Sequence, residues 1–209
     1  MENIKWIFFD MGYTLVNEDG AHEARISEAK KYLSKQGISI TSEQVWQEAY
    51  RFGRMLKSPI PNALRSFGAK KIKKYSTEDG EVAYDDARST LLRLKEKYKI
   101  GIIANQPMGS SERLRRYGLL DCVDAVFESE ALGLFKPDVN FYKYALNVVG
   151  CKASEAVMVG DRPDNDIVPA SQVGMHTVRI IRGFFKYAPD VIAPDFVVMS
   201  LDQLNDIFD

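Results

Sequence analysis

The sequence predicts an α/β fold: a doubly wound parallel sheet with a Rossmann-like core and a small helical domain inserted after the first strand. Three observations lead to this prediction. Six short apolar runs recur along the 209 residues. The runs are apolar at successive positions, which is typical of parallel strands covered by helices on both faces. Helical patterns separate most of the runs, and residues 17–83 contain helical patterns alone.

Taken in chain order, the apolar runs predict six strands, and two helix starts are visible between them. A helix is expected to begin at Asp85 or Asp86, because either side chain can cap the apolar face that follows. Another is expected to begin at Asp138. Alternating strands and helices favour a doubly wound sheet. The expected strands are Ile4–Phe9, Ile100–Ala104, Val123–Phe127, Ala156–Val159, Thr177–Ile180 and Phe196–Val198.

The helical insertion is expected to form a second, smaller domain. Two amphipathic patterns occur within it, and Thr41 with Gln44 forms a candidate capping box at the start of the second. We therefore expect a catalytic core made of residues 1–16 and 84–209, and a helical cap made of residues 17–83.

Composition narrows the class of protein. Hydrophobic residues make up 45% of the chain and the formal net charge is −1, so we expect a real core and no nucleic-acid partner. No apolar run is long enough to cross a membrane, and Lys5 and Asp10 interrupt the only N-terminal run. Two cysteines predict neither a disulfide framework nor a metal knuckle. We expect a cytoplasmic protein, and no motif specifies its oligomeric state.

Polar residues follow several of the expected strands. In an open parallel sheet, ligands bind beyond the carboxyl ends of the strands, where such residues meet. Two of the segments that carry them read "GLFKPD" and "GDRPDND". The polar residues of interest are Asp10, Asn105, Lys136, Asp161 and Asp166, and Ala104 is included because it ends the strand before Asn105.

Three of these residues, Asp10, Asp161 and Asp166, are expected to converge. Close carboxylates raise each other's pKa unless a cation lies among them. Lys136 supplies one positive charge, and a hard divalent ion would supply the rest, for which Mg²⁺ fits best. Together the cations would attract a phosphate, whose oxygens the backbone N–H groups after Asp10 and around Asn105 could bind.

The motifs resemble those of a known family. "DMGYTL", "GIIANQ", "GLFKPD" and "VGDRPDNDI" resemble motifs one to four of the haloacid dehalogenase-like (HAD) hydrolase superfamily, in the right order and over nearly the whole chain. The helical insertion resembles a C1-type cap. The resemblance implies a Mg²⁺-dependent phosphatase that hydrolyses a small phosphate monoester.

The resemblance also implies residue roles. Asp10 would be the nucleophile that forms an aspartyl-phosphate. Asp10 and Asp161 would ligate Mg²⁺ with the Gly12 carbonyl, and Asp166 would ligate it through water or orient Lys136. Lys136 would offset the charge of Asp10 and the phosphate. The phosphate site would comprise Thr14, Ala104, Asn105 and Lys136, with Thr14 fixing the loop by hydrogen bonding.

Two positions depart from the pattern of the family. Gly12 stands where phosphatases of the family carry an acid–base Asp, and such catalysis is worth about 10²–10⁴ in rate. Ala104 replaces a phosphate-binding Ser or Thr. We therefore expect a slow phosphatase. The alternatives are a phosphate- and metal-binding relative with little turnover and a haloacid dehalogenase-type hydrolase. A phosphorylatable receiver domain is disfavoured, because it should lack the helical insertion.

Overall fold

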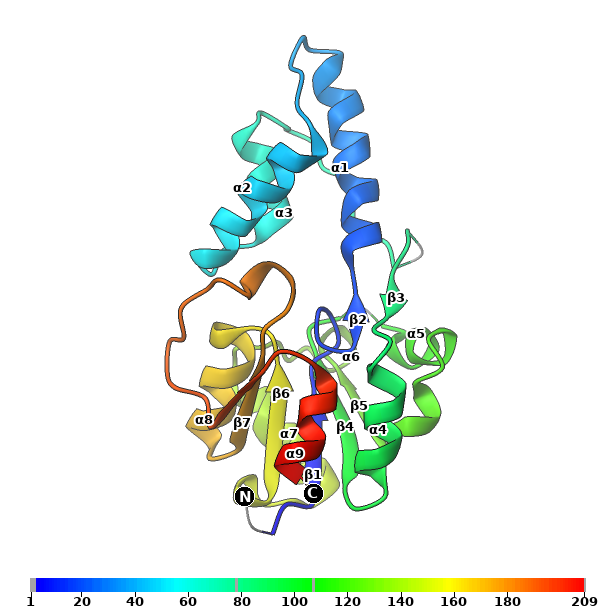
Figure 1. Cartoon of the computed structure of the whole chain (residues 1–209), viewed down its shortest axis with the longest axis vertical. Helices are drawn as coiled ribbons and strands as arrows, with labels where there is room; N and C mark the ends of the chain where they lie inside the picture. The colour runs from blue at the N-terminus through cyan, green and yellow to red at the C-terminus, as the bar shows by residue number, and fades with distance from the viewer. Residues whose placement is uncertain (1–2, 78, 107, 209) are drawn as a thin grey trace. The chain divides into compact units, whose positions relative to one another are not determined.

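The computed structural model describes residues 3–77, 79–106 and 108–208, which fold into two compact units (Figure 1). A core unit comprises Met1–Val16, Ala83–Arg182 and Asp190–Asp209. A helical unit comprises Asn17–Val82 and Gly183–Pro189. The sequence-based boundaries had assigned residues 183–189 to the core, whereas the structure groups them with the helical unit.

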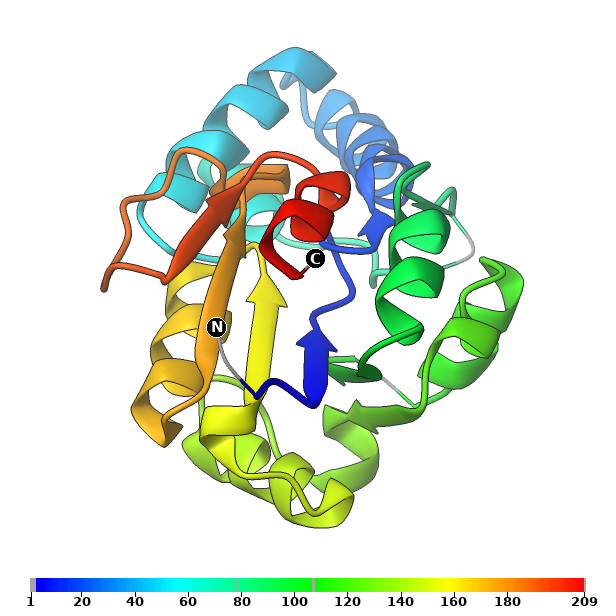
Figure 2. The same cartoon turned by 60° about the horizontal axis from the view of Figure 1, so that its bottom comes forward.

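The core unit is built on a six-stranded parallel sheet, which confirms the predicted fold class. Its strand order is β5-β4-β1-β6-β7-β8. Figure 2 shows β1, β6 and β7 side by side and pointing the same way. The six strands coincide with the six apolar runs to within two residues at either end. They are β1 (Trp6–Phe9), β4 (Lys99–Ala104), β5 (Ala125–Glu128), β6 (Ala156–Gly160), β7 (His176–Ile180) and β8 (Phe196–Val198).

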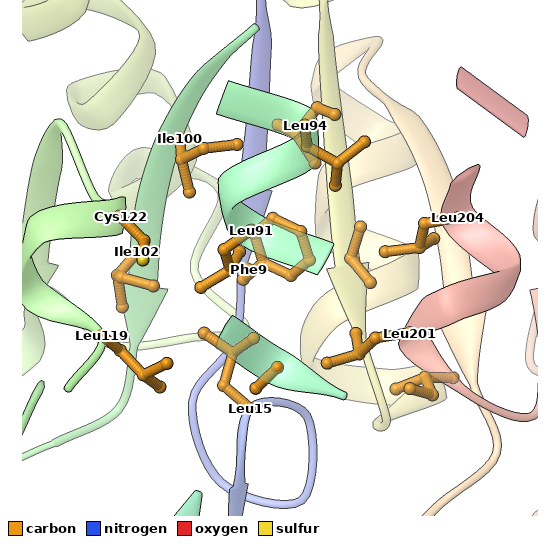
Figure 3. Packing of buried hydrophobic residues seen from close by; sticks show 14 of the residues in the cluster. Phe9, Leu15, Leu91, Leu94, Ile100, Ile102, Leu119, Cys122, Leu201 and Leu204 are labelled. Atoms are coloured by element: carbon orange, nitrogen blue, oxygen red, sulfur yellow. The ribbon is translucent and has the colours of Figure 1, made fainter. Parts of the chain in front are cut away.

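Side chains from both faces of the sheet are buried, which explains the continuous apolar runs. Phe9 of β1 belongs to the apolar cluster on one face, where Leu91 and Leu94 of helix α4 (Ala87–Lys95) pack (Figure 3). Phe8, its neighbour in sequence, belongs to the cluster on the other face with Phe141 of helix α7 (Val139–Val149). A strand buried on both faces cannot alternate apolar and polar residues.

One predicted helix cap is confirmed and one is wrong. The Asp138 side chain accepts a hydrogen bond from the N–H of Asn140 and caps α7 as expected. Asp86 precedes α4 but makes no capping hydrogen bond. Its carboxylate instead accepts from the Arg182 guanidinium and from the N–H of Leu201, because these long-range donors compete with the local one. The other core helices are α5 (Ser110–Arg116), α6 (Ser129–Leu132), α8 (Val168–Val173) and α9 (Leu204–Phe208).

The helical unit contains α1 (Asp19–Ser34), α2 (Ser42–Arg54) and α3 (Pro59–Ser66). The predicted capping box at the start of α2 is present, since the Thr41 side chain accepts from the Gln44 N–H and the Gln44 side chain accepts from the Thr41 N–H. Two short strands, β2 (Val16–Asn17) and β3 (Val82–Ala83), pair where the chain passes between the units. Sequence periodicity cannot reveal strands of two residues. Within the described part of the chain, no helix combines the length and apolarity that crossing a membrane requires.

Residues 183–189 pack within the helical unit through aromatic side chains. The ring of Phe184 stacks on that of Trp46, with centroids 5.1 Å apart and an interplanar angle of 18°. The rings of Tyr50 and Tyr187 meet edge to face at 5.9 Å. At Gly53, an added Cβ would lie 2.2 Å from the Phe184 carbonyl oxygen. Helix α2 can therefore approach residues 183–189 this closely only because residue 53 is a glycine.

Candidate active site

The carboxyl ends of β1 and β6 place two carboxylates side by side. These strands are neighbours in the sheet, with Phe9 opposite Val159. Asp10 follows Phe9, and its N–H donates to the carbonyl of Val159 at 2.9 Å. Gly160 ends β6, and Asp161 follows it. Because parallel strands end at the same edge of the sheet, Asp10 and Asp161 emerge together.

The turn after β6 brings in a third carboxylate. Asp166 lies in the π-helical turn Pro163–Ile167, and its Oδ2 accepts from the N–H of Arg162 at 2.9 Å. An added Cβ at Gly160 would lie 2.3 Å from the same Oδ2, so only glycine leaves room for Asp166. One carboxylate oxygen each from Asp10, Asp161 and Asp166 lies within 4.8 Å of the other two, and all three residues are buried.

Lys136 bridges two of the three carboxylates. Its Nζ lies 2.6 Å from Asp10 Oδ1 and 2.6 Å from Asp166 Oδ1, and the residue is only 5% exposed. Burial lowers the pKa of Lys136, but the charges of Asp10 and Asp166 outweigh burial and hold this pKa above its usual value. The side chain is therefore a fixed ammonium ion between two acids.

Lys136 does not compensate all of the negative charge of the three carboxylates. Burial, followed by the charges of Asp166 and Asp10, raises the pKa of Asp161 well above its usual value. Burial also raises the pKa of Asp166 to about 6, although Lys136 acts in the opposite direction. The Arg162 guanidinium is held by Asp164, with Nη2 and Oδ2 at 2.7 Å. One lysine cannot balance the charge of three buried carboxylates, so a further cation would stabilise their ionised forms.

The donor set fits a hard divalent cation. Among the described residues, no hydrogen-bond donor contacts the Asp161 carboxylate or the Gly12 carbonyl oxygen. In folded proteins, a buried carboxylate is usually paired with a cation or coordinates a metal ion. Carboxylate and carbonyl oxygens are the ligands that Mg²⁺ prefers, usually few in number and completed by water. Asp10, Asp161, Asp166 and the Gly12 carbonyl could hold such an ion.

Backbone donors open toward the same end of the sheet. In the part of the chain that the structure describes, the N–H groups of Met11, Gly12 and Asn105 have no hydrogen-bond partner. Met11 and Gly12 follow β1, and Asn105 follows the neighbouring strand β4. Successive free N–H groups of this kind bind anions such as phosphate.

None of three side chains expected at the phosphate site presents an accessible and unpaired polar group to an anion. The Thr14 hydroxyl is fully buried and has no hydrogen-bond partner among the described residues, whereas the Thr14 carbonyl accepts from Arg182 Nη1 at 3.2 Å. The hydrogen bond expected at Thr14 is therefore made by its main chain and not by its side chain. Ala104 packs into the apolar cluster of the core, and its methyl group offers nothing to an anion. The carboxamide of Asn105 hydrogen-bonds to the backbone of Lys136.

Three carboxylates, a lysine and free backbone N–H groups thus lie at the carboxyl ends of the parallel strands of this α/β fold. The chain belongs to the haloacid dehalogenase-like hydrolase family, whose profile matches residues 4–174. The resemblance seen in the four motifs is thereby confirmed.

Two named relatives and one solved structure agree with this assignment. The chain is 34% identical to a glyceraldehyde 3-phosphate phosphatase of Methanocaldococcus jannaschii, over 98% of this chain and 96% of that protein. It is 32% identical to the protein of the same name from Pyrococcus furiosus, over 100% and 95% of the two chains. A HAD phosphatase from Thermococcus onnurineus superposes with a TM-score of 0.71 at 26% identity, covering 98% of this chain and 97% of that one.

Sequence reasoning missed two contacts within the site. Gly160 precedes Asp161 in the motif, but its close contact with Asp166 depends on the conformation of the turn that follows. The sequence alone does not show that conformation. The hydrogen bonds between Asn105 and Lys136 join residues 31 positions apart. Their only sequence signal is that each residue lies just beyond a strand, within a family motif.

Proposed function

We propose that the chain is a Mg²⁺-dependent phosphatase that acts on a small phosphate monoester through Asp10. The geometry of Asp10 carries the proposal. Its Oδ1 is held by Lys136, whereas its Oδ2 has no hydrogen-bond donor among the described residues and is available to attack. The free N–H groups of Met11, Gly12 and Asn105 support binding of the phosphate oxygens next to it.

In the proposed reaction, a carboxylate oxygen of Asp10 attacks phosphorus and the ester P–O bond breaks, releasing an alkoxide that takes a proton from water to become an alcohol. Water then attacks the aspartyl-phosphate, which yields inorganic phosphate and restores the carboxylate. Lys136 reduces the repulsion between Asp10 and the incoming phosphate. Asp166 holds the ammonium group of Lys136 from the other side. Bound Mg²⁺ would neutralise negative charge on the transferring group.

Glyceraldehyde 3-phosphate is the first substrate to test. Two relatives that match nearly the whole chain carry the name of glyceraldehyde 3-phosphate phosphatase. We propose that this chain acts on the same class of substrate, a small phosphorylated sugar or aldehyde, and that it does so in the cytoplasm. The uncompensated carboxylates argue against the dehalogenase alternative, whose chemistry needs no divalent cation.

Gly12 supports a second candidate function. It cannot protonate a leaving alkoxide or deprotonate the attacking water, and such help is worth about 10²–10⁴ in rate. The turnover number is therefore expected to be low, since a sugar alkoxide is a poor leaving group. In the limit, the chain would bind Mg²⁺ and phosphate without useful turnover.

The test is phosphate release from a panel of esters that includes glyceraldehyde 3-phosphate and p-nitrophenyl phosphate. Each ester is assayed with Mg²⁺ and with EDTA, beside the Asp10→Asn variant, which preserves the size of the side chain. Release that requires both Mg²⁺ and Asp10 supports the phosphatase. If wild type and Asp10→Asn release phosphate equally, Asp10 is not the nucleophile. Binding of phosphate by the wild type without release favours the binding protein.

A further inference from the structure

The side chain of Asn105 is fully engaged with one residue of the active site. Its Nδ2 donates to the Lys136 carbonyl at 2.8 Å, and its Oδ1 accepts from the Lys136 N–H at 2.7 Å. Only one orientation of the carboxamide satisfies both contacts, since the donor faces a carbonyl and the acceptor faces an N–H. The two hydrogen bonds reproduce the reciprocal pairing of a β ladder, made here by a side chain.

These two bonds are the whole hydrogen bonding of the Lys136 main chain within the described residues. Lys136 lies in the connection between α6 and α7, outside the sheet, so no ladder holds its backbone. Its Nζ nevertheless contacts Asp10 and Asp166 at 2.6 Å each. Short contacts at the end of a long, flexible side chain require a fixed backbone at its base.

The residues next to Asn105 are themselves fixed. Ala104 ends β4 and is completely buried in the apolar cluster. The N–H of Gln106 donates to Ser129 Oγ at 3.0 Å, and the Ser129 hydroxyl donates to the Gln106 carbonyl at 3.2 Å. The Asn105 side chain therefore extends from a rigid strand end, and its two hydrogen bonds restrict the movement of the Lys136 backbone.

We propose that Asn105 is a positioning residue that acts through Lys136, and that its carboxamide is not a ligand of the phosphate. The inference rests on the proposed function, because it assigns a role within the same site. Only the backbone N–H of Asn105 remains available to an anion. The residue thus joins two parts of the site, with its main chain toward the phosphate and its side chain toward the lysine.

The test is a double-mutant cycle that combines Asn105→Leu with Lys136→Met. Asn105→Leu removes both hydrogen bonds at similar volume, and it should lower kcat about 10-fold to 100-fold with little change in KM, since misplacement of about 1 Å costs this much. In the Lys136→Met background it should change kcat less than twofold, because the group it positions is gone. Asn147→Leu on the exposed face of α7 is the matched control and should match the wild type.

A direct phosphate ligand would behave differently. Asn105→Leu would then weaken the binding of inorganic phosphate, measured by calorimetry with Mg²⁺, by the same factor in the wild-type and Lys136→Met backgrounds, and this additive result would overturn the proposal. Asn105→Asp gives a second check. It keeps an acceptor for the Lys136 N–H but sets a carboxylate oxygen against the Lys136 carbonyl, and should also lower kcat.

Failure of the proposed function has its own signature. If the wild type releases no phosphate from any ester, the phosphatase proposal fails while the cycle is still measured on the dissociation constant of inorganic phosphate. Non-additive effects of the two substitutions on that constant then support the positioning role, and additive effects overturn it. Circular dichroism and thermal melting confirm that each variant is folded.

Discussion

Gly160→Ala should damage both stability and activity through one contact. The new methyl group would lie 2.3 Å from Oδ2, 2.4 Å from Cγ and 2.6 Å from Cβ of Asp166, where ordinary contacts exceed 3.4 Å. Asp166 is completely buried and cannot swing into solvent. Its Oδ1 is held by Lys136 and its Oδ2 by the N–H of Arg162, so any movement that admits the methyl group breaks these bonds.

The size of the effect follows from those bonds. Each hydrogen bond to a charged group contributes about 1.5–3 kcal/mol, so losing both costs about 3–6 kcal/mol. Overpacking adds to this cost where relaxation is incomplete. Lys136 loses one of its two anchors, and we expect phosphate release to fall by about 100-fold or more. Urea unfolding with EDTA and phosphate release with Mg²⁺ measure the two effects separately.

Gly150→Ala is the matched control for the backbone. Gly150 ends α7 with φ of 65°, and an added Cβ would meet nothing within 4 Å. Its cost is the left-handed backbone alone, about 1–2 kcal/mol, with no loss of activity. If Gly160→Ala unfolds within about 1 kcal/mol of the wild type and keeps its activity, Asp166 is not confined as the structure indicates, and the reasoning is refuted.

Three other substitutions or conditions test the charges and the missing acid. Lys136→Met should lower the free energy of unfolding in EDTA by about 3–5 kcal/mol, because the substitution leaves buried carboxylates without their cation. Mg²⁺ should restore part of the lost stability. An unchanged urea midpoint would contradict this account. In EDTA, the wild type should become less stable as pH rises from about 4 through 6. The pKa of Asp166 is about 6 in the folded protein, which is above its unfolded value. The stability that protonated Asp166 contributes at low pH is therefore lost as this carboxyl group ionises. Mg²⁺ should reduce that slope, and urea midpoints measured at about pH 5 and pH 7 with and without Mg²⁺ are the check. Gly12→Asp should raise turnover about 10-fold or more on alkyl phosphates but little on p-nitrophenyl phosphate, whose leaving group needs no acid; equal gains on both would show that Gly12 does not limit protonation.

The fold was predictable because its signals are local. The four inner strands of the core sheet, β4, β1, β6 and β7, are buried on both faces, so their sequences are continuous apolar runs. The carboxylates Asp10 and Asp161 directly follow two of these strands, β1 and β6. Strand and site are therefore adjacent in sequence. The capping box of Thr41 and the cap at Asp138 were equally visible, since each involves partners within three residues.

The features that were missed depend on partners far away in sequence. Asp86 resembles a helix cap, but the Arg182 guanidinium, 96 positions later, takes its carboxylate. Asn105 resembles a turn residue or phosphate ligand until Lys136 is placed beside it. Thr14 keeps the family residue type without a side-chain hydrogen bond in the described structure. Tertiary packing decides whether such a side chain bonds to a local or to a distant partner. The residues around one position in the sequence do not reveal which distant partner will be present.

The helical unit is discontinuous in the chain, and this limits how it can be exchanged or copied. A gene segment encoding residues 17–82 would leave behind Phe184, whose ring lies against Trp46 and whose carbonyl occupies the space beside Gly53. A chimera that transplants this unit onto a related hydrolase must carry Gly183–Pro189 as a second, separate graft. Divergence in the helices and in that heptapeptide is consequently tied together, although 100 residues of core sequence, Ala83–Arg182, stand between them.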